Sequence, residues 1–285
     1  MSDFIRERDC IMDGGVLKKY NGEGTSLIVP KSITEIGEGA FASSKIKEII
    51  VLSSVKKVGA RAFADCTELT TALFENGVES VGKEAFMGCS ALDSLHLPDS
   101  VTEIGAGAFS DCTKLCFMPI PANVTVIEER TFNNCTSLMC ALLPTKIVRI
   151  GEDAFRDCKH MFSVELPRAL TTVESGAFAG CTDLMTLIVY NKLTSICENA
   201  FAGCTSRLCV FTASGIAPFE HNLFSDSEEA VVVVTPDADL SLWNKEMVYE
   251  VDNWEKKYNK LNRSRFSLKG FFKGIFKRKG IKQKR

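Results

Sequence analysis

A phenylalanine recurs along most of this 285-residue chain at an almost constant interval. The first two members of the series are 22 residues apart, and every later interval is 23 residues. The members are Phe41, Phe63, Phe86, Phe109, Phe132, Phe155, Phe178, Phe201 and Phe224. Length alone would suggest one or two globular domains. A fixed internal period of this size instead indicates a solenoid, in which each repeat forms one coil.

Four other positions stay in register with the phenylalanine. A cysteine lies three residues after it in most repeats: Cys66, Cys89, Cys112, Cys135, Cys158, Cys181 and Cys204. Apolar residues lie five residues before it, from Ile36 to Phe219, and eight residues before it, from Ile33 to Leu193. Leu or Met lies six residues after it in most repeats. A single coil cannot bury these side chains, whereas stacked coils can.

One repeat shows how a coil should fold. Leu95 and Leu97 alternate with polar residues, which predicts a short strand with one face inward. Pro98 ends the strand, because proline has no N–H for the ladder, and Pro30, Pro121, Pro144 and Pro167 hold the same position. Phe109 and Cys112 are three residues apart, which suits a short helical or 3-10 turn with both side chains inward. We therefore expect an α/β repeat with one parallel concave sheet and such turns on the convex side.

The repeat resembles a known family. The segment Ser100–Cys112, with the sequence SVTEIGAGAFSDC, is close to the consensus of the BspA-like leucine-rich repeats. Gly15–Gly22 followed by Leu27–Pro30 resembles the family's N-terminal cap, and Ala230–Asp237 with Leu240 and Trp243 resembles its closing strand and cap. The likeness covers about residues 14–243. It divides the chain into an N-terminal cap (1–30), a solenoid (31–229), a closing strand and C-terminal cap (230–262) and a tail (263–285).

The resemblance implies adhesion or interaction proteins without a shared active site, and the residues agree. The three histidines, His96, His160 and His221, lie in different repeats and have no triad or metal-ligand spacing. No Walker loop, nucleophile elbow or zinc spacing of Cys and His occurs. The seven cysteines that follow the phenylalanines, which we call the ladder cysteines, come within disulfide range of their neighbours. Seven parallel thiols cannot all pair, however, and buried Cys behaves as a small apolar residue. We expect structural thiols, no metal, no cofactor, no small-molecule substrate and no enzyme.

The outward strand positions are the candidate binding surface. Equivalent outward positions of successive strands should form two columns on the concave face. One column runs from Ile50 to Ile188, and the other runs from Glu48 to Thr186 and includes Cys140. The candidate protein-binding residues are Ile50, Leu73, His96, Phe117, Leu142, Glu165 and Ile188. Contiguous exposed apolar surface usually marks an interaction site. The alternative is that strand propensity alone explains Ile and Leu at these positions.

The last part of the chain differs in composition from the rest. Residues 256–285 contain thirteen Lys or Arg and no acid, while the other 255 residues hold 36 acids against 21 bases. Leu268, Phe271, Phe272, Ile275 and Phe276 fall on one helical face, and Lys269, Lys273 and Lys277 on another. This basic amphipathic tail suits an anionic membrane surface or an acidic partner groove. The alternative is a solvated basic tail, and the acidic body argues against nucleic acid.

These features predict a non-catalytic protein-binding module. Its concave face would hold a protein or peptide, and its tail would attach it to a membrane surface or an acidic partner. A surface adhesion or structural protein is the alternative. The charged start, from Met1 to Arg8, lacks the apolar stretch of a signal peptide, and no run of eighteen apolar residues suggests a membrane span. We therefore expect a cytoplasmic or membrane-peripheral location.

Overall fold

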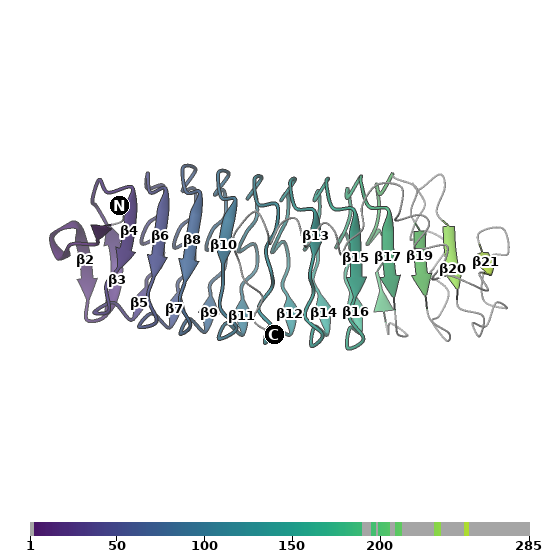
Figure 1. Ribbon diagram of the computed structural model, residues 1–285, viewed down its shortest axis with the longest axis horizontal. Helices are drawn as coiled ribbons and strands as arrows, with labels where there is room; N and C mark the ends of the chain where they lie inside the picture. The colour runs from purple at the N-terminus through teal and green to yellow at the C-terminus, as the bar shows by residue number, and fades with distance from the viewer. Residues whose placement is uncertain are drawn as a thin grey trace, which may run out of the picture.

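The computed structural model describes residues 3–189, 195–197 and 199–205, together with the backbone of three strands at 209–212, 231–234 and 248–250. The coils follow one another along the long axis of the molecule (Figure 1). We number the coils from 1 to 8 by their phenylalanines, from Phe41 to Phe201. The predicted solenoid of parallel strands is confirmed, whereas the helical part of the expected α/β repeat is not.

Each coil contributes one long and one short strand to two parallel ladders, except coil 5, which contributes a short strand only. The long strands are β4 (Ser26–Val29), β6 (Glu48–Val51), β8 (Thr71–Phe74), β10 (Ser94–His96), β13 (Cys140–Ala141), β15 (Ser163–Leu166) and β17 (Thr186–Val189). The short strands are β5 (Glu35–Ile36), β7 (Lys57–Val58), β9 (Ser80–Val81), β11 (Glu103–Ile104), β12 (Val126–Ile127), β14 (Arg149–Ile150), β16 (Thr172–Val173) and β18 (Ser195–Ile196). The register advances one repeat per coil, so that Ile50 pairs with Leu73 and Leu73 with His96.

The ends of the ladders carry additional strands. At the N-terminal end, β1 (Asp3–Phe4) runs parallel to β4, and the 3-10 helix η1 (Glu7–Asp9) leads into an antiparallel pair, β2 (Cys10–Asp13) and β3 (Val16–Tyr20). At the other end, β19 (Cys209–Thr212), β20 (Val231–Val234) and β21 (Val248–Glu250) extend the long ladder in parallel. The domain boundaries expected from the sequence remain predictions, and the basic tail lies outside the described residues.

The phenylalanines form a continuous stack through the core. Adjacent rings from Phe41 to Phe201 lie with centroids 4.8–5.6 Å apart and planes within 20° of parallel. Tyr20 begins the stack, with its ring 5.3 Å from that of Phe41. Because each of these Phe side chains is at most 1% exposed, its burial contributes about 2–3 kcal/mol. The last member of the sequence series, Phe224, lies outside the described residues.

The expected helical or 3-10 turns around the phenylalanines are not found. The only helix among the described residues is η1 in the N-terminal cap. In all eight coils, the residues two before and two after the phenylalanine have positive φ, as at Arg61 and Asp65 around Phe63. A helix cannot continue through left-handed residues. Instead, the Phe63 N–H donates to the Ala85 carbonyl of the next coil, which adds a third row of bonds between coils.

The expected single sheet is also divided, because the short ladder is interrupted between coils 4 and 5 and the long ladder between coils 4 and 6. Strands β10 and β11 end two of the sheets, and β12 and β13 begin the other two. No backbone hydrogen bond joins residues 93–106 to 116–128, all of which are described. The row beside the phenylalanines continues across this joint, where the Phe109 N–H donates to the Thr131 carbonyl at 2.9 Å. The two halves therefore stay attached through this row and through side-chain bonds, such as that from the Ala122 N–H to the Asp99 Oδ1 at 3.0 Å.

Pro119 explains the break in the long ladder. The register of the preceding coils places position 119 beside His96, where its N–H would donate to the Leu95 carbonyl. Proline has no N–H, so this bond cannot form. The prolines that end other strands do not break the ladder, because they lie two positions later, as Pro98 and Pro167 do.

Candidate functional site

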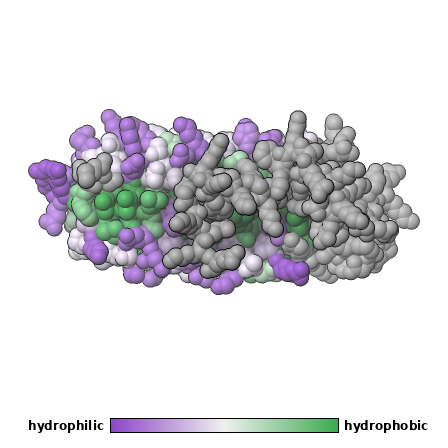
Figure 2. Space-filling view, in the orientation of Figure 1, coloured by the Kyte–Doolittle hydropathy of each residue, from purple (hydrophilic) through white to green (hydrophobic). Residues whose placement is uncertain are grey.

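The outward side of the long strands forms a continuous surface, which we call the long-strand face. Side chains at the second and fourth positions of each long strand point inward, and the first and third point outward, as the burial pattern of β8 shows. Phe4, Ile28, Ile50 and Leu73 occupy the same outward column and pair in sequence across β1, β4, β6 and β8. We call these four residues the apolar row. In Figure 2 a hydrophobic patch lies over this end of the molecule, with hydrophilic residues around it.

The side chains of the apolar row are more exposed to solvent than core side chains. Phe4 is 59% exposed and Leu73 is 40% exposed, while Ile28 and Ile50 are half-buried. Neighbouring strands of a sheet lie about 4.8 Å apart, so the four side chains form an uninterrupted strip. His96 and Pro119 continue the column and end the strip with a polar and a rigid residue.

Five of the candidate binding residues from the sequence lie at outward positions of long strands: Ile50, Leu73, His96, Glu165 and Ile188. Leu142 directly follows β13, and Phe117 lies in coil 5, which has no long strand. Leu73, His96, Leu142 and Glu165 are exposed, and Ile50, Phe117 and Ile188 are partly exposed. The structure brings Ile50, Leu73 and His96 together as successive partners, and it also pairs Glu165 with Ile188. The second group lies beyond the joint. Whether any of these residues bind a partner remains a prediction.

Sequence reasoning missed half of the apolar row. Ile28 lies in the segment Leu27–Pro30, which has the same pattern as the later strands, so its outward position could have been inferred. Phe4 carries no such signal, because β1 precedes the first repeat and joins the ladder only through its pairing with β4. Met185, 52% exposed next to β17, was also missed. Cys140, expected to face outward, is buried.

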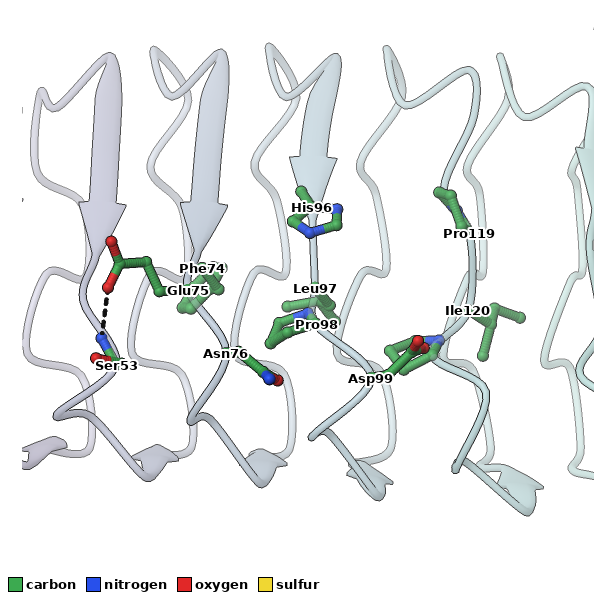
Figure 3. A pocket seen from close by; sticks show the side chains of 11 residues that line it. Ser53, Phe74, Glu75, Asn76, His96, Leu97, Pro98, Asp99, Pro119 and Ile120 are labelled. Carbon is green, nitrogen blue, oxygen red and sulfur yellow. Dashed lines mark hydrogen bonds between the residues drawn. The ribbon is translucent and has the colours of Figure 1, made fainter. Parts of the chain in front are cut away.

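An open groove of about 780 Å³ lies at the ends of the long strands of coils 2–5. Its floor is apolar and mostly buried, formed by Phe74, Leu97 and Ile120 with three prolines. Its polar residues are Ser53, Glu75, Asn76, His96 and Asp99 (Figure 3). Among the described residues that line it, none is Lys or Arg. The groove therefore has an apolar floor and a negatively charged rim, and it crosses the joint at Pro119.

The ladder cysteines have structural partners. Each thiol donates to the carbonyl of the phenylalanine one coil back, from Cys66 to Phe41 at 3.0 Å through Cys204 to Phe178 at 3.4 Å. Burial raises the pKa of Cys204 to about 12 and raises the pKa of Cys135, Cys158 and Cys181 well above the usual value. Protonated, buried thiols of this kind are unreactive.

Several other polar side chains form pairs between coils. Arg149 donates to Glu128 at 2.6 Å and to Glu174 at 3.0 Å, which links three successive coils. His160 contacts Asp183 at 2.9 Å in an exposed pair. The described part of the chain shows no group of three His, Cys, Asp or Glu side chains placed to hold a metal ion. Within the same residues, no helix is both long and apolar enough to cross a bilayer.

Comparison with known proteins identifies the repeat. The family model of the BspA-type leucine-rich repeat region matches residues 19–139 and 137–239, with six copies. A leucine-rich repeat protein of Bacteroides ovatus has a similar structure (TM-score 0.59, 23% identity, 88% of this chain and 74% of that chain). The T. pallidum leucine-rich repeat protein is also similar (TM-score 0.49, 25% identity, covering 76% and 85%), as is a leucine-rich cell surface protein of Faecalibacterium prausnitzii (TM-score 0.47, 19% identity, covering 85% and 93%). No curated protein matches the chain.

Proposed function

The chain belongs to the BspA-type leucine-rich repeat family, and from that premise we propose that it is a non-catalytic module that binds a protein partner on its long-strand face. Repeats of this family generally build binding scaffolds. The observation that supports this assignment is the apolar row, Phe4, Ile28, Ile50 and Leu73, which lies exposed and in register across four strands. Exposed apolar strips with a polar surround are typical of interaction sites.

Strand propensity alone accounts less well for this surface. It explains an isolated Ile or Leu on a strand. It does not explain Phe4, because a two-residue strand at the edge of the sheet needs no aromatic side chain at 59% exposure. Large aromatic side chains that become buried at an interface contribute the most to affinity, whereas Leu is under-represented among such contacts. We therefore expect Phe4 to be the strongest contact of a partner.

Capture by the full-length protein tests the proposal. Replacing Ile28, Ile50 and Leu73 together with Ser removes three of the four side chains of the strip while leaving the inward residues of the same strands unchanged. We expect the affinity for a captured and then purified partner to fall about tenfold or more, since interface anchors contribute about 2 kcal/mol or more each. Val148→Ser is the matched control, because Val148 is 41% exposed but lies outside the long-strand face. Equal binding by the triple variant and the control would contradict the proposal.

A role in surface adhesion is the second candidate for the same face. An adhesive protein would need to reach the cell exterior, whereas an intracellular module would not. Fractionation of native cells, with protease added to intact cells, distinguishes the two. Rapid digestion of the protein on intact cells would favour the adhesive role, and protection would favour an internal partner.

The basic tail is proposed as an attachment segment. Residues 263–285 lie outside the described structure, so the proposal depends on their sequence alone. Lysines attract such a segment to an anionic surface at about 1 kcal/mol each, and Phe271, Phe272, Ile275 and Phe276 can enter the interface. A peptide of these residues should bind anionic vesicles, and binding should weaken with salt. Failure to bind such vesicles at low salt would remove the membrane from the proposal.

A further inference from the structure

The groove at the joint carries two carboxylates that point in opposite directions along the solenoid. Glu75 reaches back one coil, where its Oε2 accepts a hydrogen bond from the Ser53 N–H at 3.0 Å. Asp99 reaches forward one coil, where its Oδ1 accepts from the Ala122 N–H at 3.0 Å. Figure 3 shows the two side chains at opposite ends of the groove. Both residues are exposed, so each carboxylate keeps room for a cation.

The distance between the two ends of the groove defines the ligand that fits it. Ser53 lies in coil 2 and Ala122 in coil 5, so the two carboxylates are separated by up to three coil steps, or roughly 14 Å at the spacing of sheet strands. An extended polypeptide rises about 3.3 Å per residue, so two basic side chains four residues apart span about 13 Å and lie on the same side. The residue midway between them would face the apolar floor. The groove therefore fits an extended segment with the pattern basic, any, apolar, any, basic.

The chain itself contains this pattern. Lys269, Phe271 and Lys273 hold the three positions, and Lys273, Ile275 and Lys277 repeat them. Gly270 and Gly274 each disfavour a helix by about 1 kcal/mol relative to alanine. We propose that the segment 269–277 binds in the groove of its own chain as an extended strand, with lysines four residues apart contacting Glu75 and Asp99.

The length of the chain permits this contact. From coil 4 to β21 there are seven coil steps, or roughly 34 Å, whereas the 19 residues from Glu250 to Lys269 can extend to about 60 Å. A connected segment also has an effective concentration in the millimolar range, so even weak contacts are populated. The groove and an anionic membrane would then compete for the same lysines. This inference does not depend on binding at the long-strand face.

Zero-length cross-linking of the full-length protein tests the proposal without vesicles. A carbodiimide joins a carboxylate to a lysine amine only when the two are in contact. We expect amide links from Glu75 and Asp99 to Lys269, Lys273 or Lys277, identified by mass spectrometry. The pair of Glu35 and Lys57, 3.2 Å apart, is an internal positive control. A mixture of isotope-labelled and unlabelled chains shows whether a link is within one chain.

Two variants make the test specific. Glu75→Gln with Asp99→Asn should remove the tail links, whereas Glu103→Gln with Glu152→Gln, which changes exposed acids elsewhere, should not. Exchanging Phe272 with Lys273 keeps the composition but changes the lysine spacing, and should reduce the links at least threefold. Provided that the control pair still reacts, the absence of tail links would overturn the proposal. Links to acids outside the groove, links between different chains, or equal links in the variant with the exchanged spacing would overturn it as well.

Discussion

Replacement of Phe109 by alanine tests the aromatic core directly. Phe109 is fully buried and lies between Phe86 and Phe132, with ring centroids 5.6 and 5.4 Å away. Removing a large buried aromatic side chain costs about 3–5 kcal/mol, which includes the cavity that remains. Loss of two stacked neighbours, at about 0.5–1.5 kcal/mol each, places the expected value in the upper half of that range.

Urea unfolding followed by circular dichroism measures this change. Phe4→Ala provides the matched control, because it removes the same side chain from a position that is 59% exposed. We expect this control to lose less than about 1 kcal/mol, as surface substitutions usually do. A loss below 1 kcal/mol for Phe109→Ala, or equal losses for the two variants, would refute the reasoning that the stack carries the core.

Three further predictions follow from the same coordinates. Thiol titration should label Cys112 and Cys135 only after denaturation, because burial raises their pKa; rapid labelling of either in the native protein would exclude the buried ladder. The free energy of unfolding should fall above about pH 8.5, because thiols such as Cys158 and Cys181 ionise there only in the unfolded state. Each such thiol lowers it by about 1.4 kcal/mol per pH unit, and a flat profile in alkaline urea titrations would contradict this. Pro119→Val should restore a bond to Leu95 and raise the free energy of unfolding by about 1 kcal/mol in the same urea assay, whereas a less stable variant would show that the break has another cause.

The alkaline prediction has a definite sign. An unfolded cysteine ionises near its usual pKa, about 8.5, while the native thiol stays protonated to higher pH because its pKa is raised. The native state therefore binds more protons than the unfolded state in this window. Stability contributed by these groups is fully present below about pH 8.5 and is lost as the pH rises toward the native pKa.

The periodic positions were predictable because the same physical demand repeats in every coil. Phe63, Cys66 and Leu69 must all be buried between neighbouring coils, so their spacing alone indicated a stacked core. The outward positions were predictable for a related reason. Alternation along a strand such as β8 assigns Leu73 to the opposite side from Ala72 and Phe74. Cys140 was an exception, in β13, which has only two residues.

The local backbone was less predictable. The spacing of Phe109 and Cys112 suits a helical turn, but it suits a turn with left-handed residues equally well. Gly107 and Asp111, on either side of Phe109, were the available signal, since Gly, Asp and Asn accept positive φ most readily. Pro119 was a visible signal too, because it lies two residues before the proline column. Phe4 was not predictable, since β1 precedes the first repeat and shares none of its pattern.

Hydroxyl-radical footprinting of the complex with a captured partner tests the central claim, that the long-strand face is the binding surface. The method reports the solvent accessibility of individual side chains. We predict that the partner protects Phe4, Ile28, Ile50 and Leu73 from oxidation, while Ile11 and Val148, exposed elsewhere, react as in the free protein. Protection of Ile11 and Val148 with unchanged oxidation of the apolar row would contradict the claim.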